Sequence, residues 1–192
     1  MQGIAADKFA LRKTMLAARA LVSDEQRRVA GVALARQAQM IADLAGGRVI
    51  SGFCPFRDEI DTMPLLHALA ALGQTLALPR VDGPHLIFHA WTPGDPLVVG
   101  RYGMPEPEAG TEVVQPRVLL VPLLAFDRAG SRIGYGAGFF DRVLADNPQS
   151  QTVGLAFGMQ EVAQVPTEPH DQPLQFVLTE AELIDCRAGS RD

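Results

Sequence analysis

The spacing of hydrophobic residues changes along the chain, and these changes delimit the expected helices and strands. Apolar residues that recur every three or four positions indicate helices, and short continuous apolar runs indicate buried strands. We expect helices over Asp7–Leu21, from a cap at Ser23 to Leu44, over Pro64–Leu72 and over Gly138–Ala145. We expect strands over Arg48–Phe56, Leu76–Val81, Leu86–Trp91, Arg117–Phe126, Thr152–Phe157 and Phe176–Thr179.

Cap and turn residues mark several of these boundaries. The stretch Ser23-Asp24-Glu25-Gln26 has the pattern of a capping box, in which the first and last side chains bond each other's backbone amides. Gly46-Gly47 and Gly73 follow the second and third helices, where glycine commonly ends a helix in the left-handed conformation. Asp82-Gly83-Pro84 predicts a tight turn between two strands.

The alternation of strands with helices predicts an α/β fold. The segment Arg117–Phe126 is the strongest strand candidate, and its nearly continuous apolar run is typical of a strand covered on both faces. We therefore expect an open, mostly parallel sheet with helices on both faces, a three-layer α/β/α arrangement. Ligands of such sheets bind beyond the carboxyl ends of the strands. A glycine-rich loop follows Phe126 and is expected at such an end.

The segment Thr92–Gln115 is rich in Pro, Gly and Glu and has no clear periodicity. It is expected to be a long ordered loop, with an interdomain linker as the alternative. Nothing that follows it resembles a self-sufficient unit, so we expect one domain over residues 1–192, a length typical of a single domain.

Composition and charge narrow the class of protein. Hydrophobic residues make up 47% of the chain and charged residues 20%, enough apolar material for a full core. The net charge of −5 argues against nucleic acid as the main partner, because such binding depends on neutralising phosphates. No apolar run is long enough to span a membrane. The two distant cysteines, Cys54 and Cys186, fit a reducing compartment, so we expect a cytoplasmic protein.

The stretch Arg132–Asp141 carries the strongest chemical signal. Its three glycines at alternate positions, Gly134, Gly136 and Gly138, let the backbone approach a ligand closely. The expected helix after them presents amide groups and a positive dipole that suit phosphate. The stretch lacks the Gly-Lys-Ser/Thr of a Walker loop and the GxGxxG of a dinucleotide site. A flexible structural turn is the alternative interpretation of the glycines alone.

This stretch resembles the motif of the 5-formyltetrahydrofolate cyclo-ligase family, commonly Arg-Leu-Gly-x-Gly-x-Gly-aromatic-Tyr-Asp. Other matches surround it in order, from about Lys8 to Thr179. They are Lys8 with Arg12, Phe53 with Pro55, Glu59-Ile60-Asp61-Thr62, Tyr102-Gly103-Met104-Pro105-Glu106-Pro107, Val121-Pro122, Ala125-Phe126-Asp127 and His170-Asp171. The chain departs from the motif at Ile133, Ala137 and Phe140. Phe140 lacks the hydroxyl of the usual tyrosine, which puts any role of that hydroxyl in doubt.

The resemblance implies an ATP site. On a helix, Lys8, Arg12 and Arg19 fall within about 40° of one another and form a basic stripe. A solvated helix face is the alternative, and Arg19, which the resemblance does not support, is expected on the surface. The residues implied to contact ATP are Lys8, Arg12, Arg132, Ile133, Gly134, Tyr135, Gly136, Ala137, Gly138, Phe139 and Phe140.

The resemblance also implies a folate site and a magnesium site. Glu59 is selected as a pterin ligand, although Asp58 and Asp61 rank equally by sequence alone. The residues implied to line the folate site are Cys54, Phe56, Glu59, Tyr135, Gly136, Ala137, Gly138 and Phe139. Asp141 and Asp171 are implied ligands of Mg²⁺, which takes one or two carboxylates together with water and phosphates. His170 is expected to be a surface residue rather than a base.

The implied reaction converts 5-formyltetrahydrofolate and ATP to 5,10-methenyltetrahydrofolate, ADP and phosphate, with Arg132 and Asp141 as catalytic residues. Polyglutamylated forms of the folate are further candidate substrates, and neither nucleic acid nor a membrane is expected as a partner. Two alternatives remain open at this point. One is a non-catalytic domain that senses a small ligand. The other is an enzyme acting on a sugar phosphate or CoA ester, which would not need ATP.

Overall fold

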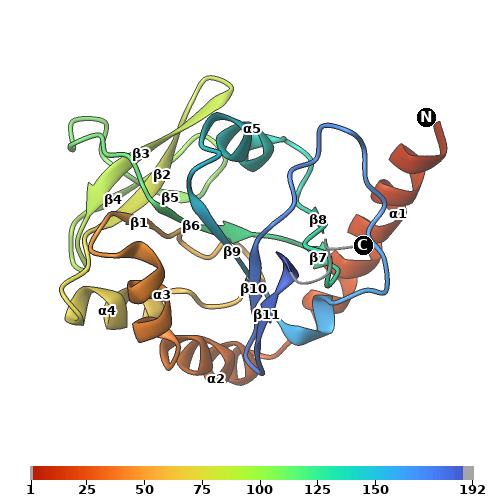
Figure 1. The fold of residues 1–192 in the computed structure, drawn as a ribbon, viewed down its shortest axis with the longest axis horizontal. Helices are drawn as coiled ribbons and strands as arrows, with labels where there is room; N and C mark the ends of the chain where they lie inside the picture. Colours follow the sequence, from red (N-terminus) through yellow and green to blue (C-terminus); the bar gives the residue numbers. More distant parts are fainter. Residues whose placement is uncertain (1, 188–192) are drawn as a thin grey trace.

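A computed structural model describes residues 2–187 and contains a central sheet with helices on both sides (Figure 1). Within these residues the main sheet has seven strands in the order β11-β10-β9-β6-β1-β2-β3. They are β1 Ile50–Ser51, β2 Leu76–Asp82, β3 His85–Trp91, β6 Val118–Pro122, β9 Gln151–Leu155, β10 Phe176–Leu178 and β11 Leu183–Asp185. The five inner strands run parallel, and the two edge strands pair antiparallel with their neighbours. The predicted α/β class is therefore confirmed.

Alternate residues of the inner strands enter two different cores. Val118 and Leu120 of β6 join the core under α2, α3 and α4, while Leu119 and Val121 join the core under α5. The helices are α2 Asp24–Ala35, α3 Ala38–Ala45, α4 Met63–Ala71 and α5 Phe139–Asp146. Figure 1 shows α5 on one side of the sheet and the other three on the opposite side. Burial on both faces explains why β6 is apolar at consecutive positions.

The N-terminal helix, α1 Gln2–Arg19, lies apart from these layers at the right of Figure 1. It packs against a small antiparallel pair, β7 Ala125–Phe126 and β8 Arg132–Ile133. A third, smaller core joins Met15 of the helix to Leu124 and Val165. Since β8 leads directly into the glycine-rich loop, this packing brings α1 next to that loop.

The predicted second helix is wrong in one respect, because it is two helices. Its start is as expected: Ser23 accepts a hydrogen bond from the Gln26 amide, and the Gln26 side chain accepts one from the Ser23 amide. The helical hydrogen bonding is interrupted at Arg36 and Gln37, and α3 then continues to Gly46, which ends it in the left-handed conformation. The break lets both pieces bury apolar faces, such as Leu34 and Ile41, in one core.

Two predicted strands are also shorter than expected. The segment Arg48–Phe56 contains only β1, and after Gly52 the chain leaves the sheet to form a wall of a cavity. The segment Arg117–Phe126 divides into β6 and β7 after Pro122, whose missing N–H cannot continue a ladder. Apolar character persists through both breaks because these residues remain buried or half-buried, so hydrophobicity alone did not reveal the breaks.

The loop predicted over Thr92–Gln115 contains a second small hairpin. Its strands are β4 Leu97–Val99 and β5 Pro105–Pro107, which pair antiparallel. Edge strand β11 and the short β8 were also not predicted, because two- and three-residue strands carry too little periodicity. Residues 1 and 188–192 of the predicted 1–192 domain lie outside the described part.

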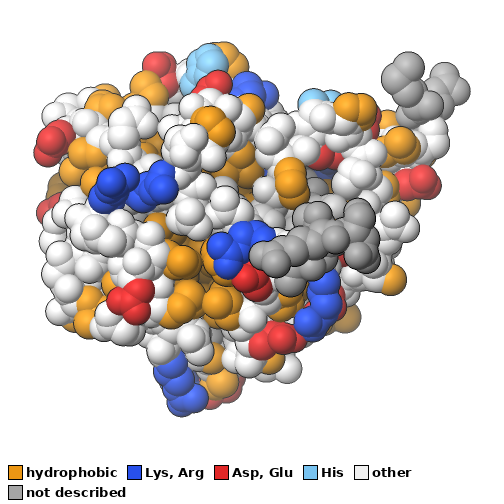
Figure 2. Space-filling model, in the orientation of Figure 1, with side chains coloured by type: hydrophobic (Ala, Val, Ile, Leu, Met, Phe, Trp, Pro, Cys, Tyr) orange, Lys and Arg blue, Asp and Glu red, His pale blue; other side chains and the backbone are white. Residues whose placement is uncertain are grey.

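Charged side chains of both signs are mixed on the visible surface. Acidic and basic side chains are interspersed over the face shown in Figure 2. Among residues 2–187, no helix combines the length and apolar character that crossing a bilayer requires.

Candidate functional site

A cavity of about 480 Å³ lies where the glycine-rich loop, α1 and the ends of several strands meet. All of the residues predicted to form the site line this one cavity. They are Lys8, Arg12, Cys54, Phe56, Glu59, Arg132, Ile133, Gly134, Tyr135, Gly136, Ala137, Gly138, Phe139, Phe140, Asp141 and Asp171. The chain contributes them from segments up to 163 residues apart, so the fold, and not sequence proximity, assembles the cavity.

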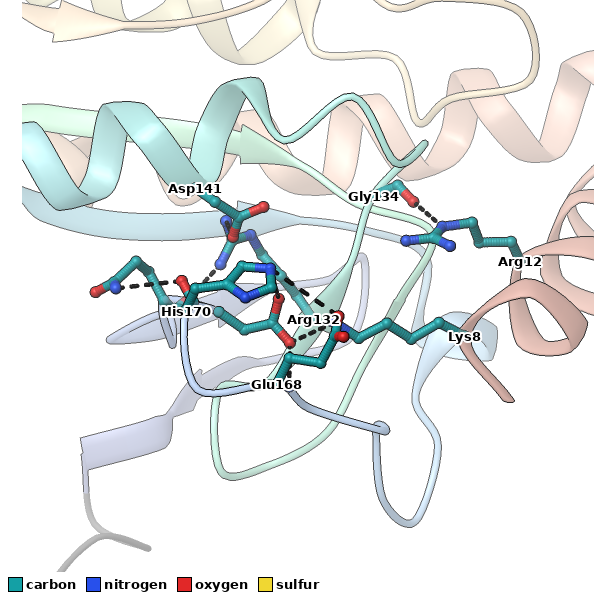
Figure 3. A network of polar contacts seen from close by, with 9 residues as sticks. Lys8, Arg12, Arg132, Gly134, Asp141, Glu168 and His170 are labelled. Carbon is teal, nitrogen blue, oxygen red and sulfur yellow. Dashed lines mark hydrogen bonds and ion pairs between the residues drawn. The ribbon is translucent and has the colours of Figure 1, made fainter. Parts of the chain in front are cut away.

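Lys8 and Arg12 project from α1 toward the cavity (Figure 3). Lys8 Nζ donates to Asp171 Oδ2 at 2.6 Å and to Glu168 Oε2 at 2.8 Å. Burial acts to lower the pKa of Lys8, but the hydrogen bonds to Asp171 and Glu168 outweigh it and raise that pKa. Arg12 Nε donates to the Gly134 carbonyl at 2.9 Å. The predicted basic residues are thus already bound to the C-terminal loop and to the glycine-rich loop.

A second ion pair lines the same cavity, between Arg132 of β8 and Asp141 of α5 (Figure 3). Arg132 Nη2 and Asp141 Oδ1 are 2.7 Å apart, and Arg132 also donates to the Gln172 carbonyl. Burial lowers the pKa of Arg132, while the neighbouring Asp141 carboxylate acts in the opposite direction. Asp141 lies in the first turn of its helix, as predicted.

The glycine-rich loop turns beside α1 with two of its glycines in backbone conformations that favour glycine. Gly136 has a φ of 100°, and a Cβ placed there would lie 3.5 Å from the Arg12 guanidinium carbon. Gly138 has a φ of 68° and forms the N-cap of α5 in the left-handed conformation. Glycine adopts both conformations without the strain that another residue would incur. Gly136 and Gly138 are therefore required by the backbone conformation of the loop, in addition to lining the cavity.

Another part of the cavity lining contains the buried carboxylate of Glu59 beside two aromatic rings. Glu59 is 6% exposed and accepts a hydrogen bond from the Phe56 amide at 2.8 Å. Burial raises the pKa of Glu59 to about 7, against the opposing influence of that amide, Arg19 and Tyr135. The Phe56 ring packs edge-on against the Tyr135 ring, with centroids 6.4 Å apart. Of the three acids that sequence could not rank, Glu59 is the one that lines the cavity.

Arg19 was predicted to be a surface residue, and this prediction is wrong. Its side chain is among the largest that are fully buried, with an exposed fraction of 1%. It donates to the Tyr135 hydroxyl and, at 3.5 Å, to the Leu123 carbonyl. The error has a clear source: Arg19 shares a helix face with Lys8 and Arg12, and that face is covered by the glycine-rich loop. The basic stripe itself was the signal that could have found it.

Sequence reasoning also missed Glu168, which binds Lys8 and lines the cavity. Its oxygen, a nitrogen of His170 and an oxygen of Asp171 lie within 4.8 Å of one another. His170 is largely exposed, with 73% of its side chain accessible, as predicted. The Lys8 ammonium is held between the two carboxylates, so this cluster is already occupied by a protein cation.

Asp141 and Asp171, the two implied magnesium ligands, each keep a carboxylate oxygen that is not bound by Arg132 or Lys8. Asp141 and Asp171 both line the cavity, both offer hard carboxylate oxygens and both are partly exposed, at 33% and 17% of the side chain. Each uses one oxygen for its protein cation, Arg132 or Lys8. A site of two carboxylates completed by water and phosphate oxygens is the type that Mg²⁺ takes. The residues present therefore fit the ion.

Cys54 lines the cavity but lacks the surroundings of a nucleophile. Burial raises the pKa of its thiol to about 11, so the thiolate is scarce at neutral pH. Cys186 lies outside this cavity, is buried in the core under α5, and has its pKa raised to about 11 chiefly by burial. Both cysteines are free.

Comparison with known proteins supports the resemblance seen in the motifs. A family model described as the 5-formyltetrahydrofolate cyclo-ligase family matches residues 4–180. The 5-formyltetrahydrofolate cyclo-ligase of Escherichia coli (strain K12) is 32% identical over 174 residues, which cover 86% of this chain and 96% of that protein. The protein of the same name from Haemophilus influenzae is 34% identical over 138 residues, covering 67% and 74% of the two chains.

Solved structures show the same fold. The 5,10-methenyltetrahydrofolate synthetase of Aquifex aeolicus superposes with a TM-score of 0.81 and 29% identity, over 94% of this chain and 93% of its own. A synthetase from Mycoplasma pneumoniae gives a TM-score of 0.71 at 21% identity, over 91% and 99% of the two chains, and supports the fold alone.

Proposed function

Since this chain belongs to the 5-formyltetrahydrofolate cyclo-ligase family, and is therefore an enzyme of the ligase class, we propose that it converts 5-formyltetrahydrofolate to 5,10-methenyltetrahydrofolate with ATP as co-substrate. ADP and phosphate are the other products. The single observation that carries the proposal is the cavity, which gathers every site residue that the family motifs selected. One end of the cavity is lined by basic side chains that suit the phosphates of ATP, and the other by a buried carboxylate and aromatic rings that suit the pterin of the folate.

The end formed by Lys8, Arg12 and Arg132 suits the phosphates of ATP. These three side chains come from α1 and β8 and line the cavity together with the glycine-rich loop. The amide groups at the start of α5 add positive potential at the same place. Positive charge of this kind stabilises a phosphoryl group during its transfer, when charge accumulates on its oxygens.

Magnesium belongs to the same end of the proposed site. Asp141 and Asp171 would hold it, and it would neutralise phosphate charge there. Arg132 has a related task, because it fixes the Asp141 carboxylate at 2.7 Å and can itself contact a phosphate oxygen. Binding of a phosphate near Arg132 would partly replace the charge that Asp141 now supplies.

The end formed by Glu59, Phe56 and Tyr135 suits a pterin. A buried carboxylate can accept two hydrogen bonds from adjacent N–H groups of a planar ring, and such charge-assisted bonds are stronger than neutral ones. The edge-on pair of Phe56 and Tyr135 provides an apolar wall beside it. Phe139 lies at the junction of the two ends and packs against Tyr102, with ring centroids 5.9 Å apart.

The proposed chemistry activates the formyl group. Its oxygen attacks the terminal phosphorus of ATP, and ADP departs. N10 of the folate then adds to the formyl carbon, and loss of phosphate and of the N10 proton, which passes to phosphate or water, leaves the methenyl bridge. A formyl amide is a poor electrophile before this step, so alignment of the formyl oxygen with the phosphate is the main task of the protein. We assign no general base.

The direct test is to incubate the purified protein with 5-formyltetrahydrofolate, with and without MgATP, and to follow the methenyl product by absorbance. We expect product only with the nucleotide, together with one ADP per turnover by chromatography. Recovery of AMP and pyrophosphate would contradict the phosphoryl-transfer step. Tight folate binding with no turnover would instead indicate a ligand-sensing domain, and turnover without ATP would exclude a ligase.

A further inference from the structure

The side chain of Arg19, the last residue of α1, is buried together with its positive charge. Its guanidinium is withdrawn from water, and a buried charge is tolerated only where partners compensate it. The partners are the Tyr135 hydroxyl, the Leu123 carbonyl and the face of the Tyr135 ring, whose centroid lies 5.5 Å from the guanidinium carbon. Its Nε has no hydrogen-bond partner among the described residues. Packing alone does not explain why a cation is kept there.

Arg19 is not among the residues that line the cavity within the described chain, whereas Tyr135 and Glu59 both line it. The guanidinium therefore lies behind the cavity wall and can act on a ligand only through its neighbours. Tyr135 connects the two: its hydroxyl accepts a hydrogen bond from Arg19, and its ring packs edge-on against Phe56, whose amide donates to the Glu59 carboxylate. The hydroxyl also acts to lower the pKa of Glu59. The order of the three groups is cation, hydroxyl, carboxylate.

The positions of Arg19 and Tyr135 bear on the protonation state of Glu59. A carboxylate as buried as Glu59 tends to be protonated, because burial disfavours the charged form. A protonated carboxyl cannot accept two hydrogen bonds as a charged partner. Arg19 and Tyr135 both act in the opposite direction and favour the charged form of Glu59.

We propose that Arg19 is a positioning residue, which holds the Tyr135 hydroxyl against Glu59 from behind the cavity wall and so keeps the Glu59 carboxylate charged for the pterin. The inference rests on the proposed function, since it assigns Glu59 to the folate substrate. It also gives α1 a role at both ends: Lys8 and Arg12 lie at the phosphate end, and Arg19 acts at the folate end. One helix then serves both substrates.

The groups that act on Glu59 come from three places. Arg19 belongs to α1, Tyr135 to the glycine-rich loop and the Phe56 amide to the loop of Glu59 itself. The other charged or titratable side chains that line the cavity are Lys8, Arg12, Cys54, Arg57, Tyr102, Glu106, Arg132, Asp141, Glu168, His170 and Asp171. Of these, Lys8 pairs with Asp171 and Glu168, and Arg132 pairs with Asp141, so each of these cations has a carboxylate of its own at the phosphate end.

The test is the pH profile of kcat/KM for 5-formyltetrahydrofolate at saturating MgATP, compared among the parent, Arg19→Met and Arg19→Lys. Methionine keeps much of the length of the side chain but removes the charge, so the pKa of Glu59 should rise and the acidic limb should move to higher pH. For a rise of about one unit from a pKa near 7, we expect a loss of roughly fivefold at pH 7 that is largely recovered at pH 9. Arg19→Lys restores the charge and should move the limb back toward the parent.

Two further variants separate this role from a structural one. Arg28→Met removes an exposed arginine of α2 that pairs with Glu25, so it changes the net charge equally and should leave the profile unchanged. Tyr135→Phe removes the connecting hydroxyl and should move the limb in the same direction as Arg19→Met, by less. The KM for ATP should stay within about twofold of the parent value in Arg19→Met, because its loss is confined to the pterin end.

An NMR titration of the Glu59 carboxyl carbon, assigned with Glu59→Gln, measures the same shift without relying on turnover. A higher Glu59 pKa in Arg19→Met than in the parent supports the inference. Equal pKa values, or superimposable profiles in active and folded variants, overturn it. If Arg19→Met does not fold, Arg19→Lys and Tyr135→Phe decide the question by the same criteria. A parent that binds folate but makes no methenyl product contradicts the proposed function, and the titration still judges the role of Arg19.

Discussion

The two ends of the cavity handle charge in opposite ways. At the phosphate end, each of two cations already holds a carboxylate: Lys8 binds Asp171 at 2.6 Å, and Arg132 binds Asp141 at 2.7 Å. At the pterin end, the Glu59 carboxylate is buried without a direct ion pair among the described residues, and burial raises its pKa to about 7. Paired charges fix geometry, whereas a lone buried charge is adjusted by its surroundings.

This difference indicates how each end is expected to respond to its ligand. The ion pairs of the phosphate end hold both members in place before ATP arrives, and the opposing pKa changes of Lys8 and Asp171 reflect their mutual stabilisation. Burial opposes both changes, yet the hydrogen bond between them raises the pKa of Lys8 and lowers that of Asp171. The pterin end instead depends on protonation, so its ligand affinity is expected to vary near neutral pH.

The largest expected effect comes from Asp141→Asn, which alters the phosphate end. Asparagine is nearly isosteric, so the fold should survive, but it is a weaker ligand for Mg²⁺ and a weaker partner for Arg132. We expect a loss of at least about 100-fold in kcat/KM, since charged contacts are worth roughly 1.5–3 kcal/mol each and two are affected. Steady-state kinetics at saturating folate measure it. Asp146→Asn, a change in the same helix at a residue that does not line the cavity, is the matched control.

The same variant tests the metal site without turnover. Ligand at a hundred times its Kd stabilises a protein by about 2.7 kcal/mol, which for a chain of this size raises Tm by roughly 5–10 °C. Parent and Asp141→Asn are melted with ATP plus Mg²⁺ and with ATP plus a chelator. Mg²⁺ should enlarge the shift in the parent and not in the variant. An equal enlargement in both would remove Asp141 from the metal site and leave Asp171 alone.

The next largest effect is expected at the pterin end. Glu59→Gln removes one charged hydrogen-bond acceptor, which should lower kcat/KM for folate by roughly tenfold to a hundredfold. The KM for ATP should change little, because the phosphate end keeps both of its ion pairs. Asp58→Asn is the control, since Asp58 pairs with Arg27 and does not line the cavity. Equal losses for both substrates in folded Glu59→Gln would contradict the division into two ends.

Glu59 should also reduce stability at neutral pH. Its pKa rises from 4.5 to about 7 on folding, so between these values the folded state binds more protons than the unfolded state. The contribution of Glu59 to the free energy of unfolding therefore falls as pH rises from about 4.5 to 7, by about 3 kcal/mol as an upper bound. Urea melts at pH 5 and pH 8 should show Glu59→Gln gaining stability over the parent only at the higher pH. A constant difference between the two proteins would contradict the burial effect.

The smallest effect is expected from His170→Ala. The side chain is exposed, and its nitrogen lies 3.8 Å from Asp171 and 4.0 Å from Glu168, at the outer side of the Lys8 cluster. Exposed pairs of this kind contribute little. We expect kcat/KM to change by less than about threefold, as measured at pH 6 and pH 8. A loss of the size expected for Asp141→Asn would indicate that His170 takes part in the reaction.

The sequence by itself determined the class of fold and most members of the site. The apolar run of β6 predicted a strand buried on both faces, and the ordered motifs selected every residue to which a role is assigned above except Arg19 and Glu168. Local rules also predicted the capping box at Ser23 and the place of Asp141 in the first turn of α5. These features depend on neighbours within a few residues, or on composition, and the sequence displays both directly.

The tertiary structure decided which charges meet. Lys8 and Asp171 are 163 residues apart, and nothing in their local patterns indicates that they form an ion pair. Arg19 was misplaced because its helix face is polar, and only the docking of the glycine-rich loop over α1 buries it. The raised pKa of Glu59 likewise follows from burial and not from residue type. Burial and electrostatics depend on what the chain places nearby in space, so the fold was needed to reveal them.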